Sequence, residues 1–316
     1  MSFEVLESVL RPLSYWYNQD NIEEVAINRA GQVWLRLRGK RAYPWVMYKD
    51  EKLTKEYLTD LLYIVANTYE IPFDPVAGSP VVYASIPGEH RFSAICGKNV
   101  MYDEEDLTGG IALTIRVHSD DVAFGLGDYG LKQGEKLHQI NPLKTIKDPE
   151  DPYERLLLSI KRGDHILVSG ATSTGKTTFL NNLLKILDIH KRIITIEDTR
   201  ELLVPHPNRT HIVMSRTEQT NQFDYAKIID LVVRFTPDAI IGGEISTSNA
   251  GALWELMGST TTVWPPSTRK VRPPLTRLLS IVFCILIRPW IARKRLRKCI
   301  INCESCKSTV TATCAR

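Results

Sequence analysis

The pattern of apolar and polar positions divides the chain into two halves that predict different orders of strands and helices. In the first half, short apolar runs predict strands at 25–28, 32–37, 81–84, 91–95 and 111–116, and residues 53–69 have the apolar spacing of a helix. In the second half, strands expected at 165–169, 192–196, 211–214 and 239–241 alternate with helices at 177–187, 223–235 and 246–257. Such alternation is typical of a parallel sheet. We therefore expect an N-terminal domain over 1–120, a linker over 121–152 and an α/β domain over 153–258.

The most specific motif follows the first strand of the second half. Residues 170–177 read G-x-x-x-x-G-K-T between a predicted strand and an apolar-faced helix, which is the context of a phosphate-binding P-loop. The glycines allow the turn that points backbone N–H groups at a phosphate, and the helix N-terminus adds to the attraction. Lys176 is expected to reach the β- and γ-phosphates of ATP, and the Thr177 hydroxyl to hold Mg²⁺. The predicted cofactor-binding residues here are Gly170, Ala171, Thr172, Ser173, Thr174, Gly175, Lys176, Thr177 and Thr178. The alternative is a glycine-rich turn that carries a lysine by chance.

Acidic residues follow two of the predicted strands, at the ends where ligands of parallel sheets bind. Glu197, Asp198 and Glu201 follow the second strand of this half, and Glu244 follows the fourth. Glu244 is suited to be the base that orients water for attack on the γ-phosphate, although a solvated turn is the alternative. Asp238 lies about 20 Å from Glu244 if the intervening chain rises roughly 3.3 Å per residue. The two cannot share one Mg²⁺, so we expect Asp238 to be structural.

Several segments combine into a recognisable set. GATSTGKTTFLNNLL, RIITIEDTREL, the following HPN and RFTPDAIIGGEIST resemble the secretion traffic ATPases, most closely the hexameric type IV secretion and conjugal-transfer group. PLSYWYNQDNIEEVAINRAGQVWLR and GGIALTIR resemble the N-terminal domain of that group. The resemblance covers about residues 10–257. It implies a RecA-like P-loop NTPase domain with a smaller mixed α/β N-terminal domain, assembled as a homo-oligomeric, hexameric ring.

The resemblance also implies roles for individual residues. Residues 170–177 match the Walker A motif, and the acidic group after the second strand matches the Asp box. Glu244 matches the Walker B glutamate. The catalytic residues would be Glu244, Lys176, Glu197 and Glu201, with Thr177 and Glu197 as Mg²⁺ ligands. Arg116, and less clearly Arg91, match an arginine that reaches nucleotide phosphate from the N-terminal domain. For either arginine the alternative is a solvated strand residue.

The implied function is ATP hydrolysis that powers type IV secretion, conjugative transfer or pilus assembly. The implied place is the cytoplasmic face of a bacterial inner membrane, with inner-membrane secretion components as partners and a protein or DNA–protein complex as the transported substrate. One alternative is a RecA-like nucleic-acid motor, which would need a basic, aromatic-studded surface. Residues 259–316 carry a net charge of +11 and the whole chain +4, so the first 258 residues carry the difference, −7. We therefore expect no specific nucleic-acid site in this body.

The composition changes abruptly after Gly258, where the resemblance stops. Five of the six cysteines lie in this basic tail, and the His box expected from the family is absent. A shifted reading frame can restore this box. When the third base of each codon is read with the first two bases of the next, the codons of Thr262–Val271 allow the His-box sequence GLATIHAES. We interpret the tail as the product of a frameshift and expect a motor sheet that lacks its last strands, with weak hydrolysis and assembly. A nucleotide-binding remnant without catalysis is therefore a further alternative.

Two other interpretations of the tail stay open. Its cysteines could form a Cys₄ zinc site, although their spacing is loose; these are Cys299, Cys303, Cys306 and Cys314. The basic residues 288–298 beside the apolar run 278–287 could bind a membrane or nucleic acid. That run is too short to span a bilayer, and the first residues do not resemble a secretion signal. We accordingly expect a cytoplasmic protein.

Overall fold

The computed structural model describes ten stretches of the chain. They are residues 3–38, 44–103, 109–119, 134, 146–169, 173–214, 223–246, 249–257, 262–264 and 266–267. Most of the predicted linker, Gly170, Ala171 and Thr172, the four tail cysteines and the apolar run 278–287 lie outside these stretches. No helix within them is long and apolar enough to cross a membrane.

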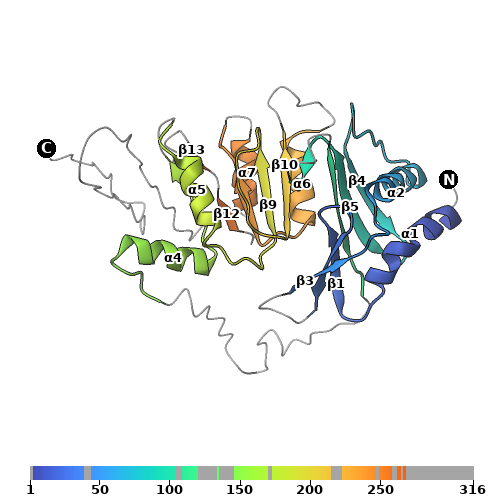
Figure 1. The fold of residues 1–316 in the computed structure, drawn as a ribbon, viewed down its shortest axis with the longest axis horizontal. Coiled ribbons are helices and arrows are strands. Elements are labelled where there is room, and N and C mark those ends of the chain that lie inside the picture. The colour runs from blue at the N-terminus through green and yellow to red at the C-terminus, as the bar shows by residue number, and fades with distance from the viewer. Residues whose placement is uncertain are drawn as a thin grey trace.

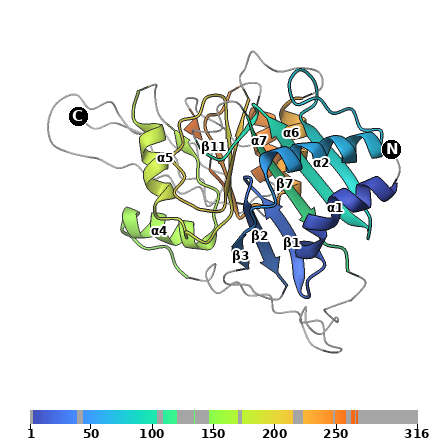
Figure 2. The ribbon, with the colours of Figure 1, turned by 45° about the vertical axis from the view of Figure 1, so that its right-hand side comes forward.

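The first half folds around a six-stranded antiparallel sheet in the order β3-β2-β1-β7-β5-β4. Its strands are β1 (Ile22–Ile27), β2 (Gln32–Leu37), β3 (Trp45–Lys49), β4 (Val81–Ile86), β5 (His90–Gly97) and β7 (Gly110–Arg116). The predicted hairpin is confirmed: β1 pairs with β2, and Gly31 takes the positive φ of +73° that the turn requires. Helices α1 (Phe3–Tyr17) and α2 (Lys55–Thr68) contact each other and cover one face (Figure 2).

The second half builds a parallel sheet, as the alternation of strands and helices predicts. Strands β9 (Ile193–Glu197), β10 (Arg209–Val213), β11 (Ala239–Gly242) and β12 (Thr262–Trp264) run parallel in the order β12-β11-β9-β10. The short strand β6 (Val100–Met101), from the first half of the sequence, adds antiparallel to the outer edge of β10. Figure 1 shows β6 between the two halves of the molecule. A separate pair joins β8 (Val168–Ser169) to β13 (Pro266–Ser267).

Alternate residues of the parallel sheet face two different sets of helices, as the period of a strand requires. Ile193 and Ile241 pack with helices α4 (Pro152–Arg162) and α5 (Lys176–Leu184). Ile194 and Ile240 pack with helices α6 (Tyr225–Arg234) and α7 (Ala250–Met257) and with the N-terminal sheet. Thr195 and Glu197 are two and four residues after Ile193 on β9, so their side chains face the same side of the sheet as Ile193, the side of α5.

Several sequence expectations need correction. The motor sheet does not end at β11, because β12 lies parallel beside it and β13 beside β8. The strand expected over 165–169 is only two residues long. Helix α4 was not predicted; it begins at the last residue of the predicted linker, where the Asp151 side chain caps its first turn and Pro152 fits a position that needs no N–H donor. Helix α1 and strand β3 were not predicted.

A group of buried polar residues, here called the interdomain cluster, joins the two halves. It contains Glu24 of β1, Asn28 after β1, Thr114 of β7, Arg192 before β9 and Thr210 of β10. Arg192 is the largest fully buried side chain. Its Nη2 donates to Thr114 Oγ1 at 3.0 Å and to Asn28 Oδ1 at 3.4 Å, and its Nη1 lies 3.6 Å from Glu24 Oε1. Charge and hydrogen bonds therefore connect the N-terminal sheet to the start of β9.

Candidate functional site

The P-loop motif lies between β8 and α5, as predicted. Ser173 and Gly175 both have left-handed backbone conformations, with φ of 61° and 82°, and helix α5 starts directly afterwards at Lys176. Gly175 occupies the N-cap position and has no side chain to cap the first turn. No side chain at the N-cap thus competes with an anion for this turn, and the N-terminus of a helix attracts anions. Gly170, Ala171 and Thr172 fall outside the described residues.

The first turn of α5 meets the acidic segment that follows β9. Lys176 and Thr177 are half-buried, and Thr178 is exposed. The Thr177 hydroxyl donates to Glu201 Oε2 at 3.3 Å. The structure therefore brings the predicted magnesium-binding hydroxyl of the P-loop to a carboxylate of the Asp box.

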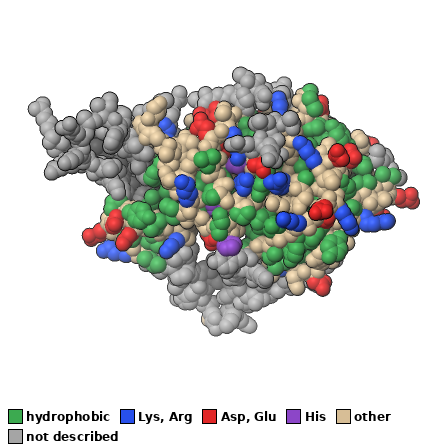
Figure 3. All heavy atoms as spheres, in the orientation of Figure 1, with side chains coloured by type: hydrophobic (Ala, Val, Ile, Leu, Met, Phe, Trp, Pro, Cys, Tyr) green, Lys and Arg blue, Asp and Glu red, His purple; other side chains and the backbone are tan. Residues whose placement is uncertain are grey.

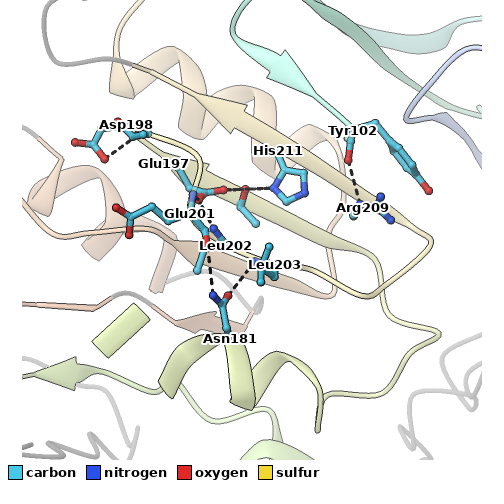
Figure 4. Close-up of polar contacts among 11 residues, drawn as sticks. Tyr102, Asn181, Glu197, Asp198, Glu201, Leu202, Leu203, Arg209 and His211 are labelled. Atoms are coloured by element: carbon cyan, nitrogen blue, oxygen red, sulfur yellow. Dashed lines mark hydrogen bonds and ion pairs between the residues drawn. The ribbon is translucent and has the colours of Figure 1, made fainter. Parts of the chain in front are cut away.

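Glu197 occupies a buried cluster of its own, the Glu197 cluster, which comprises Thr195, Glu197, His211 and the backbone amides of residues 201 and 202 (Figure 4). Glu197 Oε1 accepts a hydrogen bond from the Thr195 hydroxyl at 2.7 Å and lies 3.3 Å from His211 Nδ1. Glu197 Oε2 accepts from the amides of Glu201 and Leu202, each at 2.8 Å. Both oxygens are thus engaged inside the protein.

The titration behaviour of this cluster follows from its hydrogen bonds. Burial alone would raise the pKa of Glu197, but the donors His211, Glu201 N–H and Thr195 outweigh it and hold that pKa below its ordinary value. Burial lowers the pKa of His211, in spite of the nearby Glu197 carboxylate. We therefore describe the pair as an ionised carboxylate beside a neutral imidazole.

Asn181 ties the acidic segment to α5 and was not singled out from the sequence. Its Nδ2 donates to the Glu201 carbonyl at 3.3 Å, and its Oδ1 accepts from the Leu203 amide at 2.9 Å. Asn181 lies four residues after Thr177 and therefore one helical turn along the same face. That spacing was the sequence signal that could have identified it. Figure 4 shows Asn181 reaching the segment from the helix below it.

Glu244 follows β11 at the same edge of the sheet. Gly242 of β11 is in register with Ile196 of β9, and the Gly243 amide donates to the Ile196 carbonyl at 2.8 Å. Gly243 lies so close to β9 that an added Cβ would be 2.9 Å from Glu197 Cγ. Glu244 is half-buried and directly follows this close approach of Gly243 to Glu197. Its carbonyl accepts from Asn249 Nδ2 at 3.1 Å.

Four further residues singled out from the sequence have other contacts. Asp198 caps its own segment by accepting from the Thr199 amide at 2.8 Å. Arg116 and Arg91 are exposed and directly opposite each other on β7 and β5. Among the described residues, no hydrogen bond or ion pair joins either arginine to the P-loop. Asp238 accepts from the Arg192 amide at 2.8 Å at the entrance of β9, which confirms its predicted structural role.

The donors present can be compared with those that Mg²⁺ requires. No group of three or more His, Cys, Asp or Glu side chains in the described stretches could hold a metal by itself. The arrangement instead suits an ion held by one or two protein oxygens together with phosphate oxygens. Thr177 and Glu201 supply two such oxygens side by side. Glu197, whose oxygens already accept four donors, fits this role less well.

Comparisons with known proteins agree with this arrangement. The family described as "Type II/IV secretion system protein" matches residues 17–252. The type IV secretion system protein VirB11 of Brucella suis biovar 1 is 29% identical over 259 residues, which cover 76% of this chain and 67% of that protein. The PtlH homolog of Bordetella bronchiseptica is 28% identical over 252 residues, covering 76% and 70%. This chain thus spans about two thirds of the length of such relatives.

One solved structure has the same fold over most of the chain. It is the VirB11 ATPase from the Brucella suis type IV secretion system in complex with sulphate. The TM-score is 0.66 at 24% identity, and the match covers 84% of this chain and 79% of that one. The architecture of this chain is therefore an N-terminal domain joined to a parallel-sheet domain that carries the P-loop.

Proposed function

Because the chain belongs to the type II/IV secretion system protein family, we propose that it is an ATP-hydrolysing motor of type IV secretion or conjugative transfer. The observation that carries this proposal is the contact between Thr177 and Glu201. It connects the first turn after a P-loop to the acidic segment at the end of β9, and both are the sites where a magnesium nucleotide is bound and hydrolysed in P-loop enzymes. The fold and relatives described above support the same function.

We assign the chemistry as follows. The amides at the start of α5 and the Lys176 ammonium hold the nucleotide phosphates. Thr177 and Glu201 provide oxygens for Mg²⁺, which neutralises charge on the phosphates when it is bound. Glu244, at the end of β11, orients the attacking water and accepts its proton. Glu197 holds the segment that carries Glu201 in place.

Arg116 and Arg91 are proposed to contact the nucleotide phosphates from the N-terminal domain. Both side chains are exposed and free of hydrogen bonds to the P-loop among the described residues. Their reach to the nucleotide therefore needs a change in the position of the N-terminal sheet, or a P-loop supplied by a neighbouring subunit. If a neighbouring subunit supplies the P-loop, either arginine matters for hydrolysis only in the assembled state.

The assembly and its surroundings are further proposals. We propose a hexameric ring at the cytoplasmic face of a bacterial inner membrane, in contact with other secretion components and with a transported protein or DNA–protein complex. The relatives are named as components of type IV secretion systems, which supports this placement. Acidic and basic side chains are intermixed on the face shown in Figure 3. That distribution gives no support to the alternative of a nucleic-acid motor, at least on this face.

The proposal is tested by phosphate release from ATP by the purified chain. Glu244→Gln should lower the rate by about 10²–10⁴-fold, the usual contribution of a general base, while nucleotide affinity is kept. Unchanged release would favour a nucleotide-binding remnant, and stimulation by DNA but not by membranes would favour a nucleic-acid motor. A version with the reading frame restored after Gly258 is the matched control. We expect it to turn over faster than this chain, and equal rates would refute the proposed impairment.

A further inference from the structure

Thr195 and His211 are buried polar residues to which no role has been assigned so far. They lie directly opposite each other on the parallel strands β9 and β10, and both side chains are fully buried. Thr195 and Glu197 are two residues apart on β9 and therefore point to the same face of the sheet. Polar side chains in such a place need hydrogen-bond partners, and these two find them in Glu197.

The distances define the direction of each hydrogen bond. The Thr195 hydroxyl donates its single hydrogen to Glu197 Oε1 at 2.7 Å. His211 Nδ1 is 2.8 Å from the same hydroxyl oxygen and 3.3 Å from Glu197 Oε1. Since that hydroxyl hydrogen is already used, Nδ1 must carry the hydrogen that joins it to the two oxygens. This assignment follows from the network and gives a neutral imidazole protonated at Nδ1.

The second carboxylate oxygen of Glu197 connects this hydrogen-bonded pair to the side of the sheet where the nucleotide is proposed to bind. Glu197 Oε2 accepts from the amides of Glu201 and Leu202 at 2.8 Å. The Glu201 carboxylate in turn accepts from Thr177. One carboxylate thus links two buried strand residues to the first turn of α5. With one oxygen fixed by Thr195 and His211, its other oxygen can hold both amides in a single geometry.

We propose that Thr195 and His211 are positioning residues for the magnesium nucleotide. They fix the Glu197 carboxylate, which fixes the backbone of the acidic segment and so holds Glu201 against Thr177. This inference rests on the proposed function. A positioning role can be distinguished from a general structural role. Loss of either donor should weaken nucleotide binding in the presence of Mg²⁺ and leave nucleotide binding without Mg²⁺ unchanged.

The test compares two pairs of variants in the full chain. Thr195→Val and His211→Leu remove the donors at nearly constant volume. Thr195→Ser keeps the hydroxyl, and His211→Asn keeps an N–H donor two bonds from Cβ, where Nδ1 lies. The affinity for a fluorescent ATP analogue is measured with Mg²⁺ and with EDTA. Hydrogen exchange of the segment 198–203 is measured without nucleotide.

We expect Thr195→Val and His211→Leu to weaken Mg²⁺-dependent affinity by about tenfold and to leave affinity in EDTA within about twofold, since partners of metal ligands act through the metal. Both variants should also speed hydrogen exchange in the segment 198–203. The Ser and Asn variants should behave as the wild type. Equal losses with and without Mg²⁺, or no loss at all, would overturn the proposal. Thr195→Val decides the result if His211→Leu does not fold. A wild-type chain that binds no nucleotide, or binds it without any Mg²⁺ effect, would instead refute the proposed function.

Discussion

Glu197 and Glu24 are both buried carboxylates at places where parts of the fold meet, and their surroundings differ. Glu197 accepts four donors within 3.3 Å, and its pKa lies below the ordinary value. Glu24 accepts from Thr236, and its other oxygen has the Arg192 guanidinium at 3.6 Å but no hydrogen bond among the described residues. Burial raises the pKa of Glu24, because the attraction of Arg192 offsets it only in part.

The difference separates two ways of using a buried charge. Hydrogen bonds fix the direction of each partner, so the Glu197 cluster defines one geometry for the nucleotide side of the sheet. An ion pair without hydrogen bonds constrains distance more than direction. Within the interdomain cluster, the contact between Glu24 and Arg192 is therefore less directional than the hydrogen bonds of Arg192 to Thr114 and Asn28. Arg192 also lies over the rings of Trp45 and Phe235, at 5.0 and 5.5 Å, and these contacts tolerate small displacements.

The same substitution at the two carboxylates should have the most unequal effect. In Glu197→Gln the amide nitrogen faces two donors and leaves them unsatisfied, so we expect a loss of about 2–5 kcal/mol. In Glu24→Gln the Thr236 bond can be kept, and Arg192 retains Asp238, Asn28 and Thr114 as partners. Because Asp238 still attracts Arg192, we expect a smaller loss there, about 1–2 kcal/mol, below the roughly 3–5 kcal/mol that a buried charge left without any partner costs. Urea unfolding of both variants measures the difference, and similar losses would remove the contrast between the clusters.

Gly243→Ala tests how tightly the Glu197 cluster is packed. The new Cβ would lie 2.9 Å from Glu197 Cγ and 3.3 Å from its Cα. Because β9 cannot move away easily, we expect a loss of about 1–3 kcal/mol in unfolding free energy. Gly251→Ala is the control, since nothing lies within 4 Å of a Cβ added in helix α7. It should be neutral or stabilising. Equal behaviour of the two variants would mean that β11 adjusts freely.

The stability contributed by Glu24 should fall as pH rises. Its pKa in the folded state lies above the ordinary value of 4.5, so the contribution is complete below pH 4.5 and is lost as pH increases through the folded-state pKa. Glu24→Gln removes this loss. As pH rises, the unfolding free energy of Glu24→Gln should therefore increase relative to that of the unmodified chain, by at most about 1.4 kcal/mol per pH unit.

The groups facing Glu24 make this measurement simple to interpret. The charged groups nearest to it are Arg192, Arg36 and Arg116, and arginines stay protonated between about pH 4 and 8. A difference that is flat with pH would show that Arg192 fully compensates the buried carboxylate. In that case the two clusters would be electrostatically alike.

The smallest effect is expected at Asn181, which supports the acidic segment from outside the buried cluster. Asn181→Ala removes the hydrogen bonds to the Glu201 carbonyl and from the Leu203 amide. Both groups can turn to water, so we expect a loss of about 0.5–1.5 kcal/mol. Asn182→Ala is a matched control, because Asn182 bonds only within its own helix. A larger loss at Asn181 than at Glu197 would reverse the proposed order of importance.

The sequence predicted most of this fold where the pattern was periodic or the motif specific. The hairpin at Gly31, the parallel strands β9, β10 and β11 and the start of α5 after Gly175 all follow from local pattern and turn chemistry. The pattern missed strand β3, which has only five residues. It also missed helices α1 and α4, although Asp151 and Pro152 are strong local signals of a helix start at α4.

The candidate site was only partly predictable. The sequence placed Glu197 and Glu244 at the carboxyl ends of two strands, and the structure shows that these strands, β9 and β11, are neighbours. It could not show that Glu197 faces Thr195 and His211, because the pairing of β9 with β10 is a tertiary fact. Nor could it foresee that residues 262–264, beyond the family resemblance, lie as a strand beside β11. A strand of three residues is weakly specified by its own sequence, because β-propensity depends on context.

Strand β6 has a consequence for how this protein is made. It closes the outer edge of β10, and Asn99 beside it bonds to Val213 in both directions across a separation of 114 residues. During synthesis the N-terminal half leaves the ribosome first, so the partner for this edge is present before β10 emerges. An edge that would otherwise attract other nascent chains is thereby covered as it forms. Protection from aggregation at this edge thus depends on the order in which the chain is synthesised.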